Sequence, residues 1–215
     1  MLIDSHCHLD RLDLTAHGGS LDAALDAARA RGVGHFLCIG VSADNAAAVK
    51  GLTECYADVD CSVGVHPLDL EPCAAPALDW LLGELNHPQV VAIGETGLDY
   101  HYEPEAAELQ QQAFRLHLQA AQVTGKPVIV HTREARVDTL ALLREVARQV
   151  PVDRLLVETD SPYLAPIPHR GKPNLPEYVR DVAEYLAVLR GVSFEQLAEQ
   201  TSANFKRLFP LARVG

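Results

Sequence analysis

Short apolar runs alternate along the chain with longer amphipathic stretches, and this rhythm limits the folds that are open to it. The centres of successive runs lie about 26 to 37 residues apart, which leaves room for one helix between two parallel strands. Parallel strands that are buried on both faces read as continuous apolar runs. The pattern therefore predicts an α/β fold with a parallel sheet. The runs comprise residues 2–3, 36–39, 62–65, 90–93, 128–130 and 155–157.

The stretches between the runs carry the period of an α-helix. One apolar stripe begins at Leu21, directly after Ser20, which is a favoured helix-capping residue. Ser193 and Gln196 form a capping box for the last predicted helix. A longer stripe, on a helix of about four turns, consists of Leu109, Ala113, Leu116, Ala120 and Val123.

The composition is that of a globular protein. Of the 215 residues, 48% are hydrophobic and 22% are charged, and no linker or low-complexity tract divides them. We therefore expect residues 1–215 to form a single domain. No run approaches ~18 apolar residues, so no membrane-spanning helix is expected. The start of the chain lacks the basic region of a signal peptide.

The net charge and the cysteine content limit which binding partners and which cellular compartment are expected for this protein. The formal net charge of −11 excludes a broad basic surface for nucleic acid, although bound metal ions can supply local positive charge. The five cysteines form no C-x-x-C pair and are odd in number, which indicates reduced thiols in a cytoplasmic protein. No membrane contact is expected, and no stable protein partner can be inferred from the residues.

Nearly every apolar run is followed by a side chain that can bind a metal ion. His6 and His8 follow the first run, and Glu95, His131 and Asp160 follow the fourth, fifth and sixth. The carboxyl ends of parallel strands meet at one edge of a sheet, so these side chains should converge. His6 and His8 project from the same face of an extended segment, where two imidazoles can bind one divalent ion. The sequence therefore predicts a metal site formed by these five residues.

The other histidines are interpreted according to their place relative to the runs. His66 also ends an apolar run, and we interpret it as a substrate-binding residue. Five others follow no run and are expected at the surface or at helix ends: His17, His35, His87, His101 and His117. Cys7 lies between two predicted ligands, but its alternation places it on the opposite face of the strand, so it is not expected to act as a nucleophile.

A basic loop at residues 166–174 is interpreted as a phosphate clamp. It follows the last run and contains His169, Arg170 and Lys172, while Arg133 follows the fifth run. The planar fork of arginine meets phosphate oxygens in pairs. The alternative is a solvated basic loop that binds nothing. Motifs of competing chemistries are absent from the sequence, including the serine-hydrolase elbow, the P-loop, the dinucleotide-binding loop and H-E-x-x-H.

Six motifs in combination resemble the TatD family of metal-dependent deoxyribonucleases, within the wider amidohydrolase-like group of barrels. They follow one another in the family's order over nearly the whole chain. The resemblance implies a TIM-like (β/α) barrel that holds two divalent metal ions, and Zn²⁺, Mn²⁺ and Mg²⁺ are the candidates. The motifs are DSHCHLD, GVHPL, GETGLDY, KPVIVHTR, DRLLVETDSPYLAP and PHRGKPN.

The same resemblance implies a role for each matching residue. His6 and His8 match ligands of the first ion, and His131 matches a ligand of the second. Glu95 matches the carboxylate that bridges both ions, and Asp160 matches an aspartate that binds metal and assists the attacking water. Glu95 and Asp160 are thus the expected catalytic residues. The family acts on DNA, and some relatives are described as removing D-aminoacyl groups from tRNA.

The chain departs from the family between Glu145 and Val146. There the family carries a segment of roughly fifty residues with about two further strands, their helices and a histidine that ligates the second ion. Either the molecule carries a segment that the sequence omits, or the segment was deleted, or the gene encodes a smaller fold. Six strands would leave two unprotected sheet edges, so we favour the first explanation. The intact mass of the purified chain separates it from the other two.

The sequence thus predicts a hydrolase that cleaves phosphodiester bonds of DNA with water activated by two metal ions. Two alternatives are open. The same ligands could serve an ester or amide hydrolase, such as a D-aminoacyl-tRNA deacylase. A remnant with one ion could serve as a binding module, which the missing histidine would favour. The residues do not distinguish exonuclease from endonuclease action and do not determine strand preference or oligomeric state.

Overall fold

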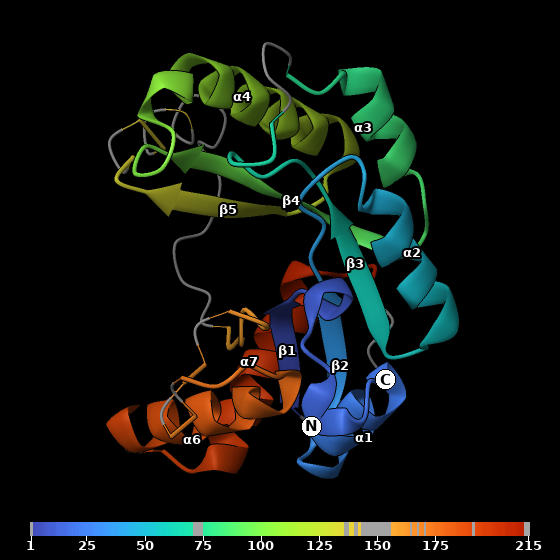
Figure 1. Ribbon diagram of the computed structural model, residues 1–215, viewed down its shortest axis with the longest axis vertical. Coiled ribbons are helices and arrows are strands. Elements are labelled where there is room, and N and C mark those ends of the chain that lie inside the picture. Colours follow the sequence, from blue (N-terminus) through green and yellow to red (C-terminus); the bar gives the residue numbers. More distant parts are fainter. Residues whose placement is uncertain are drawn as a thin grey trace. The chain divides into compact units, whose positions relative to one another are not determined.

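The computed structural model describes residues 2–70, 75–135, 138–139, 142, 156–163, 165–166, 168–169, 171–190 and 192–212. Within these residues five strands alternate with helices, and the strands pair in parallel, so the predicted α/β class is confirmed (Figure 1). The strands are β1 (Leu2–Cys7), β2 (Val33–Cys38), β3 (Val59–Val63), β4 (Val90–Asp99) and β5 (Val128–Arg133). The helices are α1 (Leu21–Ala30), α2 (Ala46–Cys55), α3 (Leu78–Leu85), α4 (Ala107–Thr124), α6 (Val179–Arg190) and α7 (Phe194–Leu208).

The chain divides into two compact units. The first comprises Met1–Ile39, Leu52–Asp60 and Asp153–Gly215, and the second comprises Gly40–Gly51 and Cys61–Val152. Each unit is assembled from separate stretches, and both α2 and β3 contribute residues to each unit. The single domain at residues 1–215 stays a prediction. None of the helices in the described residues is long and apolar enough to cross a membrane.

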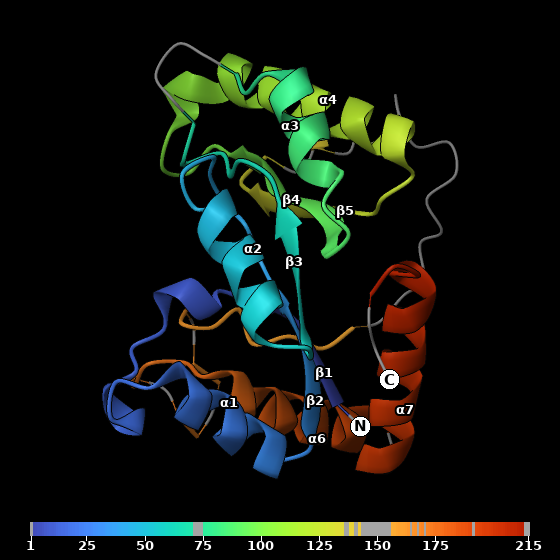
Figure 2. The same cartoon turned by 90° about the vertical axis from the view of Figure 1, so that its right-hand side faces the viewer.

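The first unit is built around β1. This strand pairs in parallel with β2, and the amide of Phe36 in β2 donates to the carbonyl of Asp58, just before β3. α7 and α6 pack against β1 and against each other, and α1 packs against β2 (Figure 2). All six residues of β1 are buried, so its carboxyl end, with His6, is held rigidly from both sides.

The predicted sixth strand at residues 155–157 is not observed as a strand in the described part of that run, yet the chain from Val157 to Ser161 runs beside β1. Ser5 N donates to Val157 O (3.2 Å), Asp160 N to His6 O (2.9 Å) and His8 N to Ser161 O (2.6 Å). The run is therefore at the expected edge of β1, but its backbone is too irregular to form a ladder. The joint between Glu145 and Val146 lies outside the described residues.

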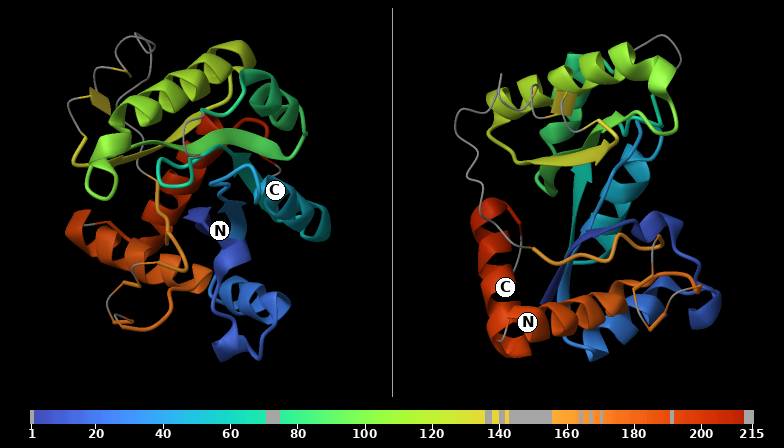
Figure 3. Two further views of the ribbon diagram at one scale, coloured as in Figure 1. Left: turned by 45° about the horizontal axis from the view of Figure 1, so that its top comes forward. Right: turned by 90° about the vertical axis from the view of Figure 1, so that its left-hand side faces the viewer.

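The second unit is built around β4, which pairs in parallel with β3 and β5. α4 packs against β4, and α3 packs beside α4 (Figure 3). Leu98, Phe114 and Leu118 form the centre of the core between α4 and the strands. Gly97 has a φ of 141°, and a Cβ there would lie 2.0 Å from the carbonyl oxygen of its register partner, His131. Only glycine allows β4 to approach β5 at this point.

Two histidines that were expected at the surface or at helix ends are buried, so that part of the prediction is wrong. His35 Nε2 lies 3.0 Å from Asp60 Oδ2, and its ring packs edge-on against Phe205. His117 Nδ1 lies 2.7 Å from Ala113 O, and its Nε2 accepts a hydrogen bond from Val65 N (3.0 Å). Each ring is buried because its polar atoms find partners inside the protein.

The apolar stripe predicted on α4 is shifted around the helix. The buried face includes Gln110 and His117, whereas Val123 is 65% exposed. The buried Gln110 donates to Asp99 O (3.0 Å) and accepts from Asp99 N (2.8 Å). The buried face of α4 therefore includes polar side chains that find hydrogen-bond partners inside the protein, and it differs from the predicted apolar stripe. The capping of α1 by Ser20 and the capping box of α7 are confirmed.

His117 should make the unfolding free energy depend on pH. Burial lowers the pKa of His117 to about 4, while the unfolded residue titrates near 6.5. On acidification the unfolded state binds a proton first, so stability falls between pH 7 and pH 4. We expect the difference in unfolding free energy between wild type and His117→Gln to shrink by about 2 kcal/mol from pH 7 to pH 5, as measured by urea unfolding. A difference that stays constant over this range would contradict the assignment.

Candidate metal centres

The first unit brings His6, His8 and Asp160 together. The Nε2 atoms of both histidines lie 3.5 Å from Asp160 Oδ1. Metal–ligand bonds of about 2.0–2.1 Å at tetrahedral angles place neighbouring donor atoms roughly 3.4 Å apart. Two imidazoles and a carboxylate at this spacing therefore fit one divalent ion.

Hydrogen bonds orient the ligands of this first triad. His8 Nδ1 lies 3.2 Å from Ile39 O, so this nitrogen donates and Nε2 keeps its lone pair for a metal ion. Asp160 has a φ of 56°, a conformation that aspartate tolerates better than most residues. Its amide donates to His6 O (2.9 Å), which fixes the carboxylate relative to the two imidazoles.

Asp4 is a buried carboxyl group beside this triad that the sequence analysis did not single out. It accepts hydrogen bonds from Thr159 Oγ1 (2.6 Å) and Thr159 N (3.0 Å). Burial raises the pKa of Asp4 to about 7, against the lowering effect of these hydrogen bonds. Asp4 thereby ties β1, which carries His6, to the segment that carries Asp160.

The second unit brings His66, Glu95 and His131 together, with one donor atom of each within 4.8 Å of the others. His131 Nδ1 lies 3.3 Å from Glu95 Oε1, and the ring centroids of His66 and His131 are 4.4 Å apart. The register of β4 against β5 shifts between Ile93 and Thr96, next to Glu95. This second triad again offers two imidazoles and one carboxylate.

Asp99 is a carboxylate that contacts His131 of the second triad, and the sequence analysis did not single it out. Its side chain is completely buried, and Oδ2 lies 3.0 Å from His131 Nε2. His131 Nε2 therefore carries a proton, which it donates to Asp99. Nδ1, which faces Glu95, is the nitrogen that can bind a metal ion. Asp99 lies four residues after Glu95 in β4 and on the same face of the strand, which is the signal that could have revealed it.

The ionisation of this pair follows from its contacts. Burial alone would raise the pKa of Asp99, but hydrogen bonds from Tyr102 N and His131 hold it below its ordinary value. Burial would lower the pKa of His131, but its hydrogen bonds with Glu95 and Asp99 raise it. Asp99 is thus an ionised carboxylate next to an imidazole that favours a proton or a metal ion.

The predicted phosphate-binding residues have different surroundings. Arg133 is 44% exposed, with Nε 3.9 Å from Asp99 Oδ2. His169 stacks on Tyr178, and its Nε2 lies 3.2 Å from Asp181 Oδ2. Lys172 is exposed, and Arg170 lies outside the described residues. In the same loop, Asn174 Nδ2 donates to Thr159 O (2.7 Å), so the loop is attached next to Asp160.

The structure therefore gathers the predicted ligands into two groups. It places His6, His8 and Asp160 in one unit and Glu95 and His131 in the other. It also places His66, which the sequence analysis interpreted as a substrate-binding residue, in the second group. Cys7 is buried and belongs to neither group, and its Sγ donates to Leu37 O (3.5 Å).

Comparison with known proteins identifies the relatives of this chain. The profile of a family described as TatD related DNase matches residues 3–147 and 141–210. The uncharacterized metal-dependent hydrolase YcfH of Escherichia coli K12 is 43% identical over 255 positions, covering 97% of this chain and 95% of the relative. A protein of Salmonella typhimurium named 3'-5' ssDNA/RNA exonuclease TatD is 28% identical, covering 87% of this chain and 92% of the relative.

Structural similarity extends over the same length. The crystal structure of YjjV, a TatD homologue from Escherichia coli K12, matches with a TM-score of 0.82 and 27% identity, covering 97% of this chain and 98% of that one. This similarity confirms the predicted TIM-like fold class. The profile matches in two stretches that overlap at residues 141–147, around the joint between Glu145 and Val146, and the alignment with YcfH is longer than this chain. The relatives thus carry positions that this sequence lacks. The chain belongs to the TatD-related DNase family of metal-dependent hydrolases.

Proposed function

We propose that this chain cleaves phosphodiester bonds of DNA and that each triad holds one divalent ion. The observation that carries the proposal is the pair of triads, each with two imidazoles and one carboxylate at metal-ligand spacing. The name of the Salmonella relative supports a nucleic-acid substrate. The mixed imidazole and carboxylate donors favour Zn²⁺ or Mn²⁺ over Mg²⁺.

Bound divalent ions supply Lewis-acid polarisation of the phosphoryl group and lower the pKa of water. In this proposal Asp160 accepts a proton from the attacking water and returns it to the leaving oxygen, the role that the family resemblance gives it. Its Oδ1, which faces both His6 and His8, would also help to hold the ion of the first triad. Glu95 is the carboxylate that the family resemblance assigns to both ions. His66 takes the position of a third donor in the second triad.

Cations of the chain hold the phosphates that flank the cleaved bond. Arg133 follows His131 on β5, and Lys172 lies in the loop that Asn174 attaches next to Asp160. We propose that these two, with Arg170 of the same loop, bind phosphate oxygens. His169 is engaged with Asp181 and Tyr178, so we assign it to positioning the loop. Cys7, Cys38 and Cys61 are buried thiols, and cysteine thiols of this kind support a cytoplasmic location.

Paired substrates test the proposal. The metal-free protein, reloaded with Zn²⁺ or Mn²⁺, is assayed on a DNA oligonucleotide and on an aminoacyl-tRNA ester. We expect cleavage of the oligonucleotide that is lost on chelation and restored by the ion. Hydrolysis of the aminoacyl ester alone would overturn the phosphodiester assignment, because both substrates would have met the same loaded site.

A further inference from the structure

Tyr102 is a large aromatic side chain that lies exposed beside the second triad. Its exposed fraction is 60%, although a tyrosine ring gains by burial. Arg133 places its guanidinium carbon 5.1 Å from the centre of the Tyr102 ring, within the range of a cation–π contact. The His101 ring packs edge-on at 4.7 Å, and His101 Nδ1 lies 3.1 Å from Glu134 Oε1. The ring is thus held by its neighbours and remains open to a ligand.

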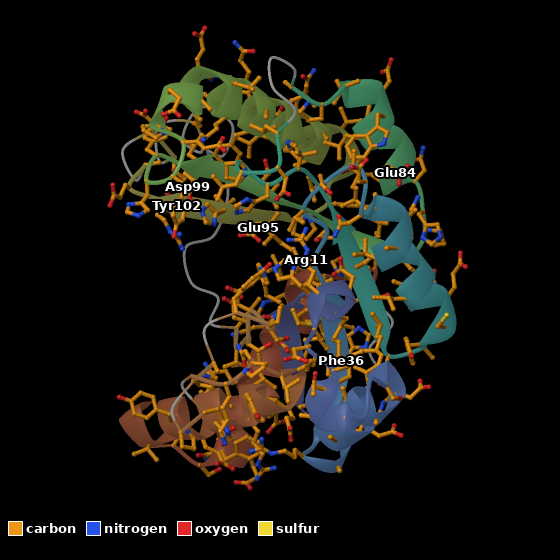
Figure 4. All side chains as sticks on the ribbon, in the orientation of Figure 1. Arg11, Phe36, Glu84, Glu95, Asp99 and Tyr102 are labelled. Carbon is orange, nitrogen blue, oxygen red and sulfur yellow. The ribbon has the colours of Figure 1, made fainter. Side chains whose placement is uncertain are left out.

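The same buried carboxylate fixes this tyrosine and the second triad. Asp99 Oδ1 accepts hydrogen bonds from Tyr102 N and His101 N, both at 3.0 Å, while Oδ2 faces His131 Nε2. Figure 4 shows Asp99 and Tyr102 close to one another in the unit that also contains Glu95. Tyr100 N donates to Arg133 O (3.0 Å), which ties the chain before Tyr102 to the end of β5. The backbone of Tyr102 is therefore anchored to the same carboxylate that contacts His131.

We infer that Tyr102, backed by Arg133, is the platform on which an unpaired nucleobase of the substrate stacks. Proteins that bind single-stranded nucleic acid combine aromatic rings for the bases with cations for the backbone, and this pair offers one of each. A base inside a duplex has both faces covered by its neighbours, so the platform selects unpaired nucleotides. Stacking does not require a basic surface, which suits a chain with a net charge of −11. This inference rests on the proposed function and adds the residue that binds the base.

The charged side chains around Tyr102 agree with a site in which the ring binds the base and Arg133 binds the phosphate. Glu134 is paired with His101, and the buried Asp99 is paired with His131. Among the described residues, Arg133 is the cation that contacts the Tyr102 ring. Its side chain is 44% exposed and keeps N–H groups for a phosphate oxygen while its carbon faces Tyr102. The base and its phosphate would then be recognised by adjacent side chains.

Binding and cleavage measured separately on the same variants test the platform. Tyr102→Ala should raise the Kd of a fluorescent single-stranded oligonucleotide about 5- to 100-fold in anisotropy measurements, with the number of bound metal ions unchanged. Tyr102→Phe and Tyr102→Trp should restore the affinity, because stacking needs the ring and not the hydroxyl. Tyr185→Ala is the matched control, since Tyr185 is 66% exposed on α6 in the other unit.

Base-free oligonucleotides complete the test. On an oligonucleotide with abasic residues at its end, wild type and Tyr102→Ala should bind equally. Equal affinity of the two proteins for the normal oligonucleotide, or a loss in Tyr102→Phe as large as in Tyr102→Ala, would overturn the platform. A wild-type protein that binds the oligonucleotide through Tyr102 but cleaves no phosphodiester would overturn the proposed function and leave the platform standing.

Discussion

Replacing His8 by alanine should leave the protein with one bound divalent ion per chain instead of two, and should lower hydrolysis at least ~100-fold. The two triads share no residue, so His131→Ala should also leave one ion, and the double variant should bind none. Each substitution removes a ligand without opening a large space in the hydrophobic core, so the fold should survive. Metal content after dialysis and far-UV circular dichroism measure the two effects.

Two further variants make this experiment discriminating. His101→Ala removes a histidine that is 49% exposed and belongs to neither triad, so it should keep both ions. Glu95→Gln should weaken the binding of the ion in the second triad, to which Glu95 belongs. A His8→Ala protein with two ions and normal activity would refute the first triad.

Asp99→Asn should weaken the binding of the second ion about 10- to 100-fold and reduce activity by a similar factor. The substitution keeps the shape of the side chain but removes the negative charge that faces His131 Nε2. His131 then loses the partner that keeps its proton on Nε2 and its lone pair on Nδ1. Isothermal titration of the metal-free protein with Zn²⁺ measures the affinity independently of activity.

A matched carboxylate serves as the control for Asp99. Asp138 accepts from Tyr100 OH (2.9 Å) but contacts no member of the triad in the described residues. Asp138→Asn should therefore leave both metal affinities unchanged. If both variants bound Zn²⁺ like the wild type, Asp99 would have no part in orienting His131.

The positions of the strands and the starts of two helices were readable from local chemistry. Apolar runs of the right spacing predicted parallel strands because burial on both faces favours apolar residues in a strand interior. Ser20 and the Ser193–Gln196 pair marked helix starts because unpaired amides at the first turn need local acceptors. The same reasoning failed for the stripe on α4, where Gln110 and His117 are buried because they find polar partners outside the helix, Asp99 and Val65.

The sequence by itself determined which residues can bind metal, since imidazole and carboxylate groups at strand ends depend only on residue type and period. Residue type and period could not determine how they are grouped. The family resemblance assigned His6 and His8 to one ion and His131 to the other, and only the tertiary structure placed Asp160 with the first pair and His66 with Glu95 and His131. Orientation was likewise decided in three dimensions, because the carbonyl of Ile39 and the buried Asp99 select the nitrogen that each histidine presents. Hydrogen-bond partners that lie some thirty residues away leave no periodic trace in the chain, and they reach the ligands only when the strands pair.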